Sequence, residues 1–132
     1  MRWKYKSEQW LESALVTLDV IDMEDTINSC LSTLHRLQKQ FICNVPIRDL
    51  VSLLLSEVHR FNAYLECMLQ LKHKSFKSKH FALLVNSVYL NRVSKPDMLH
   101  LSLGALIEDK VFDHSKEIFK IANIAKIEFN IH

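Results

Sequence analysis

The longest regular pattern in the sequence begins at Pro46 and continues for about 25 residues before a lysine-rich break. Apolar residues there recur at steps of three, four and seven, the spacing of one helix face, and Pro46 suits a first helical turn because its fixed φ is helical. We expect a helix roughly 37 Å long. Its off-face apolar residues Leu53, Leu55 and Tyr64 predict that it is covered on more than one side. The main face comprises Ile47, Leu50, Val51, Leu54, Val58, Phe61, Leu65 and Met68.

A second amphipathic pattern precedes this helix. Asp22 is a suitable N-cap, and Glu24 and Asp25 in the first turn would be favoured by the helix dipole. The pattern stops near residues 43–45, because the residue before Pro46 is pushed out of the α region. The two helices and their short loop predict an αα-hairpin. The apolar stripe of this second helix comprises Ile27, Cys30, Leu31, Leu34, Leu37 and Phe41.

Shorter helices are predicted on both sides of the hairpin. Ser7 and Glu8 open the first, and residues 17–20 read as a connection. After the break at residues 72–75, Ser75 would cap a helix through Val85, and turn residues make 86–100 the longest predicted loop. Ser102 would cap the next helix, and a turn near Asp113 leads into the last one. The apolar positions of these helices are Trp10, Leu11, Ala14, Leu15, Phe76, His80, Phe81, Leu84, Val85, Leu103, Leu106, Ile107, Ile118, Phe119, Ile121, Ala122, Ala125 and Ile127.

Composition favours the all-α class. The 132 residues include one glycine and two prolines, too few of the turn residues that hairpins of strands need. At 48% hydrophobic and 24% charged residues, the chain has a globular composition. We expect a single domain over residues 1–132, an elongated bundle of about five or six helices arranged as αα-hairpins.

The cysteines and the N-terminal sequence indicate the cellular compartment. Cys30, Cys43 and Cys67 form an odd set without C-x-x-C spacing, which predicts neither a disulfide framework nor a zinc site. A reducing compartment is the simplest interpretation. The basic N-terminus is not followed by an apolar run, so no signal peptide is predicted, and no run approaches the length of about 18 residues typical of a membrane span. The default expectation is a cytoplasmic protein.

The sequence contains no recognisable catalytic chemistry. None of its seven histidines is followed by another at i+4, so no helical metal pair is predicted. Gly104 is the only glycine, which excludes a phosphate-binding loop. Cys30 and Cys67 lie within helical patterns, where a buried structural thiol is the simpler interpretation. We therefore predict no catalytic, cofactor-binding or metal-binding residues, no cofactor and no small-molecule ligand.

The break after the long helix is rich in lysine and forms a candidate interaction patch. Two phenylalanines are interleaved with these lysines, and such a pattern can contact a phosphate backbone. Acidic flanks at Asp22–Asp25 and Glu108–Asp109 and a net charge of only +2 disfavour nucleic acid. A solvated helix corner is the preferred interpretation, and a weak nucleic-acid binder is an alternative. The lysines of this patch are Lys72, Lys74, Lys77 and Lys79.

The same break resembles a family signature. Residues 71–81 read L-K-H-K-S-F-K-S-K-H-F, which is similar to the L-R-N-P-x-L-K-x-R-H-W signature of the dynein heavy-chain linker region, with Lys77 and His80 identical. Residues 99–106 resemble the family's F-T-L-x-x-L helix opening, and the segment from His114 resembles the helix after it. Trp10, Leu18–Asp19 and Leu34–Phe41 resemble the family's upstream sequence. The chain departs from the signature where His73, Lys74 and Phe81 replace Asn, Pro and Trp.

The resemblance implies a mechanical role. In the family, the linker is a helical lever that moves with the nucleotide state of a ring of AAA+ modules and carries force to the tail. This chain would be an early part of that lever, without an AAA+ module and not itself an enzyme, in an axonemal-type heavy chain acting on microtubules. Its partners would be other parts of a dynein heavy chain and of the dynein complex, in the cytoskeleton, cilium or axoneme. The implied structural corner comprises Leu71, Phe76, Lys77, His80 and Phe81.

A different class of function is also compatible with the pattern. A small helical-bundle adaptor that binds a partner helix through apolar surface would have the same periodicity. Such an adaptor would be a compact, cooperative monomer or dimer, whereas a linker segment would be an elongated particle. The sequence alone leaves this alternative open.

Overall fold

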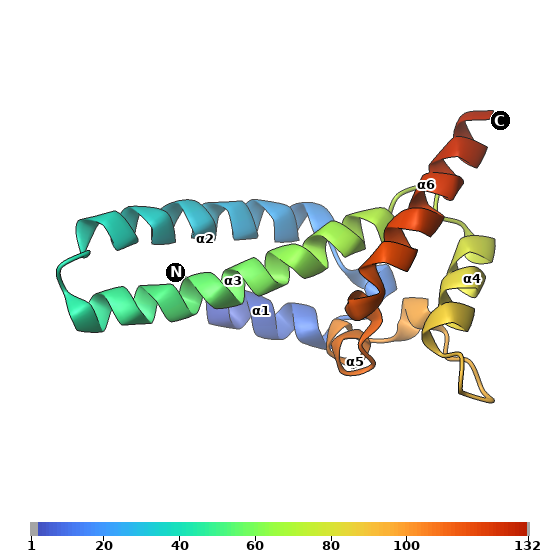
Figure 1. Ribbon diagram of the computed structural model, residues 1–132, viewed down its shortest axis with the longest axis horizontal. Coiled ribbons are helices and arrows are strands. Elements are labelled where there is room, and N and C mark those ends of the chain that lie inside the picture. Colours follow the sequence, from blue (N-terminus) through green and yellow to red (C-terminus); the bar gives the residue numbers. More distant parts are fainter. Residues whose placement is uncertain (1–2, 132) are drawn as a thin grey trace. The chain divides into compact units, whose positions relative to one another are not determined.

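The structure, a computed structural model, describes residues 3–131 and is all-α, which confirms the predicted class. Over these residues the only β-type pairing is an isolated antiparallel bridge between Ala14 and Ser102. Figure 1 shows the α-helices. Three short 3₁₀ helices, η1 to η3, lie between α1 and α2, between α4 and α5 and between α5 and α6. The elements are α1 (Trp3–Glu12), η1 (Leu15–Thr17), α2 (Val20–Gln40), α3 (Val45–Leu71), α4 (Ser78–Val88), η2 (Met98–His100), α5 (Leu103–Glu108), η3 (Val111–His114) and α6 (Ser115–Ile131).

The chain divides into two compact units. The first contains Trp3 and Asp19–Glu66, and the second contains Lys4–Leu18 and the chain from Cys67 onward. The boundary falls inside α3, between Glu66 and Cys67, so this helix contributes residues to both units.

The first unit is built on the α2–α3 hairpin, as predicted. Asp19, not Asp22, is the N-cap of α2: its Oδ1 accepts the backbone N–H groups of Ile21 and Asp22, each at 3.1 Å. The expected cap was wrong because Asp19 stands one position before the first helical residue, which leaves Asp22 in the first turn. At the other end of the hairpin, Asn44 Oδ1 accepts the N–H of Ile47 at 3.4 Å, close to the start of α3.

The core of the first unit is a narrower stripe than the sequence pattern predicts. Leu50 and Leu53 are 58% and 70% exposed, so the predictions that Leu50 lies on the covered face and that Leu53 is covered are wrong. Leu55, which the pattern also predicts to be covered, is buried, so that prediction is confirmed. The edge of Trp3 packs on Phe61, with ring centroids 5.2 Å apart. The buried residues here are Trp3, Met23, Ile27, Cys30, Leu34, Val51, Leu55, Val58, Phe61 and Leu65.

The second unit joins the segment after α1 to the segment before α5. The backbone N–H of Leu15 donates to Leu101 O, and that of Leu103 donates to Ser13 O, both at 2.9 Å. Ser102 caps α5 as predicted, its Oγ accepting the N–H of Ala105 at 3.1 Å. At Gly104 a Cβ atom would lie 3.1 Å from Leu11 O, so glycine permits this close approach.

The remaining boundaries differ from the sequence pattern by a few residues. The first helix begins at Trp3 instead of near Ser7, and α4 continues to Val88, which shortens the predicted 86–100 loop to residues 89–97. Tyr89 is buried at the end of α4, and its hydroxyl donates to Asp109 Oδ2 at 2.7 Å. Buried residues contributed by the second unit are Ser7, Trp10, Leu15, Leu18, Cys67, Met68, Leu71, Ser75, Phe76, His80, Leu84, Val85, Tyr89, Met98, Leu103, Leu106, Val111, Ile118, Ile121, Ala122 and Ala125.

Candidate functional site

The candidate site is the corner after α3, which we define as residues 71–81. Helix α3 ends at Leu71, and the backbone N–H of Lys72 still donates to Met68 O at 2.9 Å. The N–H of His73 donates to Gln70 O at 3.2 Å, which tightens the last turn. The next helix, α4, begins at Ser78.

Lys72 is the polar centre of this corner. Its ammonium group donates to three backbone carbonyl oxygens of the second unit: Leu15 O and Val16 O at 3.1 Å and Leu18 O at 2.6 Å. Hydrogen bonds from a charged donor are among the stronger ones in proteins. The end of α3 is thereby tied to η1 and the residue that follows it.

Ser75 has a different role from the helix cap that the sequence suggests. The helix begins three residues later, and Ser75 is buried beside His73. The Nδ1 atom of His73 accepts the backbone N–H of Ser75 at 3.1 Å and lies 2.7 Å from Ser75 Oγ. The expected cap was wrong because the Ser75 hydroxyl is engaged inside the turn, where it stabilises the corner itself.

His80 connects the start of α4 to α6. It is buried, and its Nδ1 accepts the backbone N–H of Lys77 at 2.9 Å, as an acceptor at the third helical position does in a capping box. Because Nδ1 is an acceptor, the ring proton lies on Nε2, which donates to Glu128 Oε2 at 3.1 Å. Lys79 Nζ reaches the same oxygen at 2.8 Å. Hydrogen bonds from Lys79 and from His80 hold the pKa of the Glu128 carboxyl below its ordinary value.

In the apolar part of the corner, Leu71, Phe76 and His80 are all buried. The rings of Phe76 and Phe81 meet edge to face with centroids 4.7 Å apart, and Phe81 is half-buried. This geometry is favourable for aromatic pairs. Lys77, in contrast, is exposed.

The structure divides the predicted lysine patch. Lys72 and Lys79 are engaged with carbonyl oxygens and with Glu128, respectively. The ammonium groups of Lys74 and Lys77 lie over the ring of Phe129, at 5.3 and 5.7 Å from its centroid. Each of the four lysines thus has a contact within the chain, and the predicted interaction patch remains a prediction.

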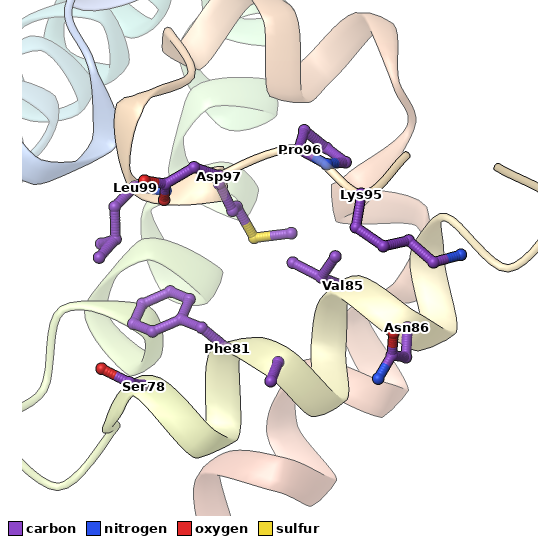
Figure 2. A pocket seen from close by; sticks show the side chains of 10 residues that line it. Ser78, Phe81, Val85, Asn86, Lys95, Pro96, Asp97 and Leu99 are labelled. Carbon is purple, nitrogen blue, oxygen red and sulfur yellow. The ribbon is translucent and has the colours of Figure 1, made fainter. Parts of the chain in front are cut away.

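A cavity of about 410 Å³ lies beside the corner (Figure 2). The side chains of Phe81 and Val85 come from α4, and Pro96 and Leu99 face them from the following segment. Its charged residues are engaged: Lys95 Nζ donates to Tyr89 O, and Asp97 Oδ2 lies 2.6 Å from His100 Nδ1. The cavity thus offers apolar surface more than reactive groups.

Sequence reasoning missed the long-range polar contacts of the corner. The partners of Lys72 lie 54 to 57 residues away, and Glu128 lies 48 residues from His80. No local spacing relates such pairs, although a lysine directly after a helix is well placed to donate to carbonyl groups. Among residues 3–131, no group of three His, Cys, Asp or Glu side chains could hold a metal ion. Across the same residues, no helix is both long and apolar enough to cross a membrane.

The described residues form an all-α fold with a hydrogen-bonded polar corner at residues 71–81. Comparison with known proteins gives its family: residues 1–132 match the family described as "Dynein heavy chain, N-terminal region 2". The chain therefore belongs to this family of dynein heavy-chain segments.

Similar proteins include axonemal dyneins. The chain is 26% identical to "Dynein axonemal heavy chain 1" of Mus musculus and 24% identical to the Homo sapiens and Rattus norvegicus proteins of that name, in each case over 99% of this chain. It spans only 3% of the length of these relatives. No solved structure matches the chain.

Proposed function

We propose that the chain is a non-catalytic lever segment in the linker of a dynein heavy chain, where it carries force between the motor ring and the tail. The family match to the N-terminal region of the heavy chain supports this role. The unbroken helix α3, with 27 residues and a length of roughly 40 Å, is a suitable stiff element.

The observation that carries the proposal is the Lys72 contact set. A lever must resist bending where one helix ends, and at this point three carbonyl oxygens are held by one ammonium group. Buried aromatic packing around Phe76 and the His80–Glu128 bond reinforce the same corner. The Lys72 and His80 contacts join segments distant in sequence, so bending the corner would break several contacts together.

The partners follow from the family. Other parts of the heavy chain and of the dynein complex are the proposed contacts, and the names of the relatives favour an axoneme within a cilium, on microtubules. ATP hydrolysis belongs to other modules of the heavy chain in this proposal, and the segment acts on their output.

Replacement of the segment tests this function. In a dynein heavy chain that carries it, residues 1–132 are exchanged for a Gly/Ser linker of equal length, which is flexible. We expect ATP turnover to persist while microtubule gliding in a surface assay is lost. Gliding at the original velocity would contradict the lever role, and loss of ATP turnover together with gliding would contradict the non-catalytic assignment.

A further inference from the structure

A small basic cleft lies between the corner and the last turns of α6, within the second unit. Its volume is about 270 Å³, and we name it the Phe129 cleft after the aromatic ring at its centre. Lys126 donates from Nζ to Gln70 Oε1 at 2.6 Å, and Lys77 lies over the same ring although it does not line the cavity. The lining residues are His73, Lys74, Lys126, Phe129 and Asn130.

The positive charge of this cleft is not neutralised within the described part of the chain. No carboxylate there forms an ion pair with Lys74, Lys77 or Lys126. The acidic residue nearest in sequence, Glu128, is held by Lys79 and His80. The ammonium groups of Lys74 and Lys77 therefore lie over a ring that is still 39% exposed, and Lys126 lines the same cleft.

Packing alone accounts for only part of this arrangement. One cation over an exposed aromatic face is a common and weakly stabilising contact, and lysines near helix C-termini are favoured by the dipole. A second cation at the same ring repels the first, which is unfavourable unless an anion joins them. The excess of charge beside exposed apolar surface thus indicates an external partner.

The geometry points to an acidic peptide segment as that partner. We propose that its carboxylates pair with Lys74, Lys77 and Lys126 while an adjacent apolar side chain covers Phe129. A single phosphate group fits less well, because it is one compact anion whereas the proposed site has three separate ammonium groups. Carboxylates spaced along a peptide can each pair with a separate lysine. This proposed peptide binding does not depend on the proposed lever role.

Fluorescence anisotropy with a labelled peptide of six glutamates and one central leucine tests the proposal. The chain of 132 residues is titrated at about 0.15 M salt, where surface pairing is already screened. The cleft variant is Lys74→Gln/Lys77→Gln/Lys126→Gln. The matched control, Lys39→Gln/Lys116→Gln/Lys120→Gln, changes the net charge equally but lies elsewhere on α2 and α6.

We expect the cleft variant to bind the peptide about tenfold more weakly, while the control keeps wild-type affinity. Phe129→Ala, at a partly exposed position, should weaken binding with all lysines present. Equal losses in the cleft variant and the control, or no measurable wild-type binding, would overturn the proposal. Displacement of the peptide by a lower concentration of inorganic pyrophosphate or of a single-stranded oligonucleotide would also overturn it, in favour of a phosphate ligand.

Discussion

The ammonium nitrogen of Lys72 lies 2.6 Å from the carbonyl oxygen of Leu18, which joins residues 54 positions apart. The same ammonium also reaches the carbonyls of Leu15 and Val16. One side chain directly after α3 thus donates to three backbone carbonyl oxygens, of which Leu15 O also accepts the N–H of Leu18. In the proposed lever role this contact would resist bending of the corner, and the role depends on it more than on any other contact.

Removal of this charge should destabilise the second unit. Lys72→Met keeps the aliphatic stem but removes the ammonium donor from three carbonyl groups, and we expect a loss of about 2 kcal/mol in the free energy of unfolding. Urea unfolding followed by circular dichroism measures this change. Lys120→Met, on the exposed face of α6, is the matched control and should leave stability nearly unchanged. Equal losses in both variants would show that the carbonyl contacts contribute little.

The lowered pKa of Glu128 predicts that the free energy of unfolding falls as the pH becomes acidic. Its pKa is lower in the folded chain than in the unfolded one, so the unfolded state binds more protons as the pH falls. The stabilisation is therefore fully present above the ordinary glutamate pKa of about 4.3 and is lost as the pH falls through the folded value. Wild type should be more stable than Glu128→Gln at pH 7, and the two should converge in acid. A difference that stays constant from neutral pH into acid would contradict this assignment.

Lys110 is the one residue of the described chain with a positive φ, 61°, between α5 and η3. The left-handed conformation costs a residue with a Cβ about 1 kcal/mol or more, whereas glycine adopts it freely. Lys110→Gly should raise the free energy of unfolding by up to about 1 kcal/mol after the entropy of the more flexible unfolded chain is subtracted. Lys110→Ala retains the strain and serves as the control. Thermal unfolding that ranks the alanine variant above the glycine variant would refute this prediction.

The buried hydroxyl of Tyr89 predicts that the free energy of unfolding falls at alkaline pH. Burial, and then the hydrogen bond to Asp109, raise the pKa of Tyr89 above its usual value. The folded state therefore holds a proton that the unfolded state releases, so this stabilisation is present below about pH 10 and is lost as the pH rises further. Tyr89→Phe should cost about 1 kcal/mol at pH 7. The difference in the free energy of unfolding between wild type and Tyr89→Phe, measured by urea unfolding, should become smaller above pH 10. A difference that grows above pH 10 would contradict the raised pKa of Tyr89.

The sequence predicts the elements well and the contacts between distant segments poorly. The spacing after Pro46 and the serine at Ser102 locate α3 and α5, because these signals are local. The exposure of Leu50 could not be predicted, since an apolar residue at helical spacing does not reveal which neighbour covers it. The corner residues follow from the family signature, but their partner Glu128 does not, because 48 residues separate it from His80.

The stall force of a dynein heavy chain carrying this segment, held in an optical trap on a microtubule, tests the lever role most directly. Lys72→Met loosens the corner without touching the ATPase modules, and Lys120→Met is the matched control. The account predicts that Lys72→Met lowers the stall force while ATP turnover per molecule stays at the control value. An unchanged stall force in a variant with a measurably destabilised corner would contradict the proposal that this corner carries force.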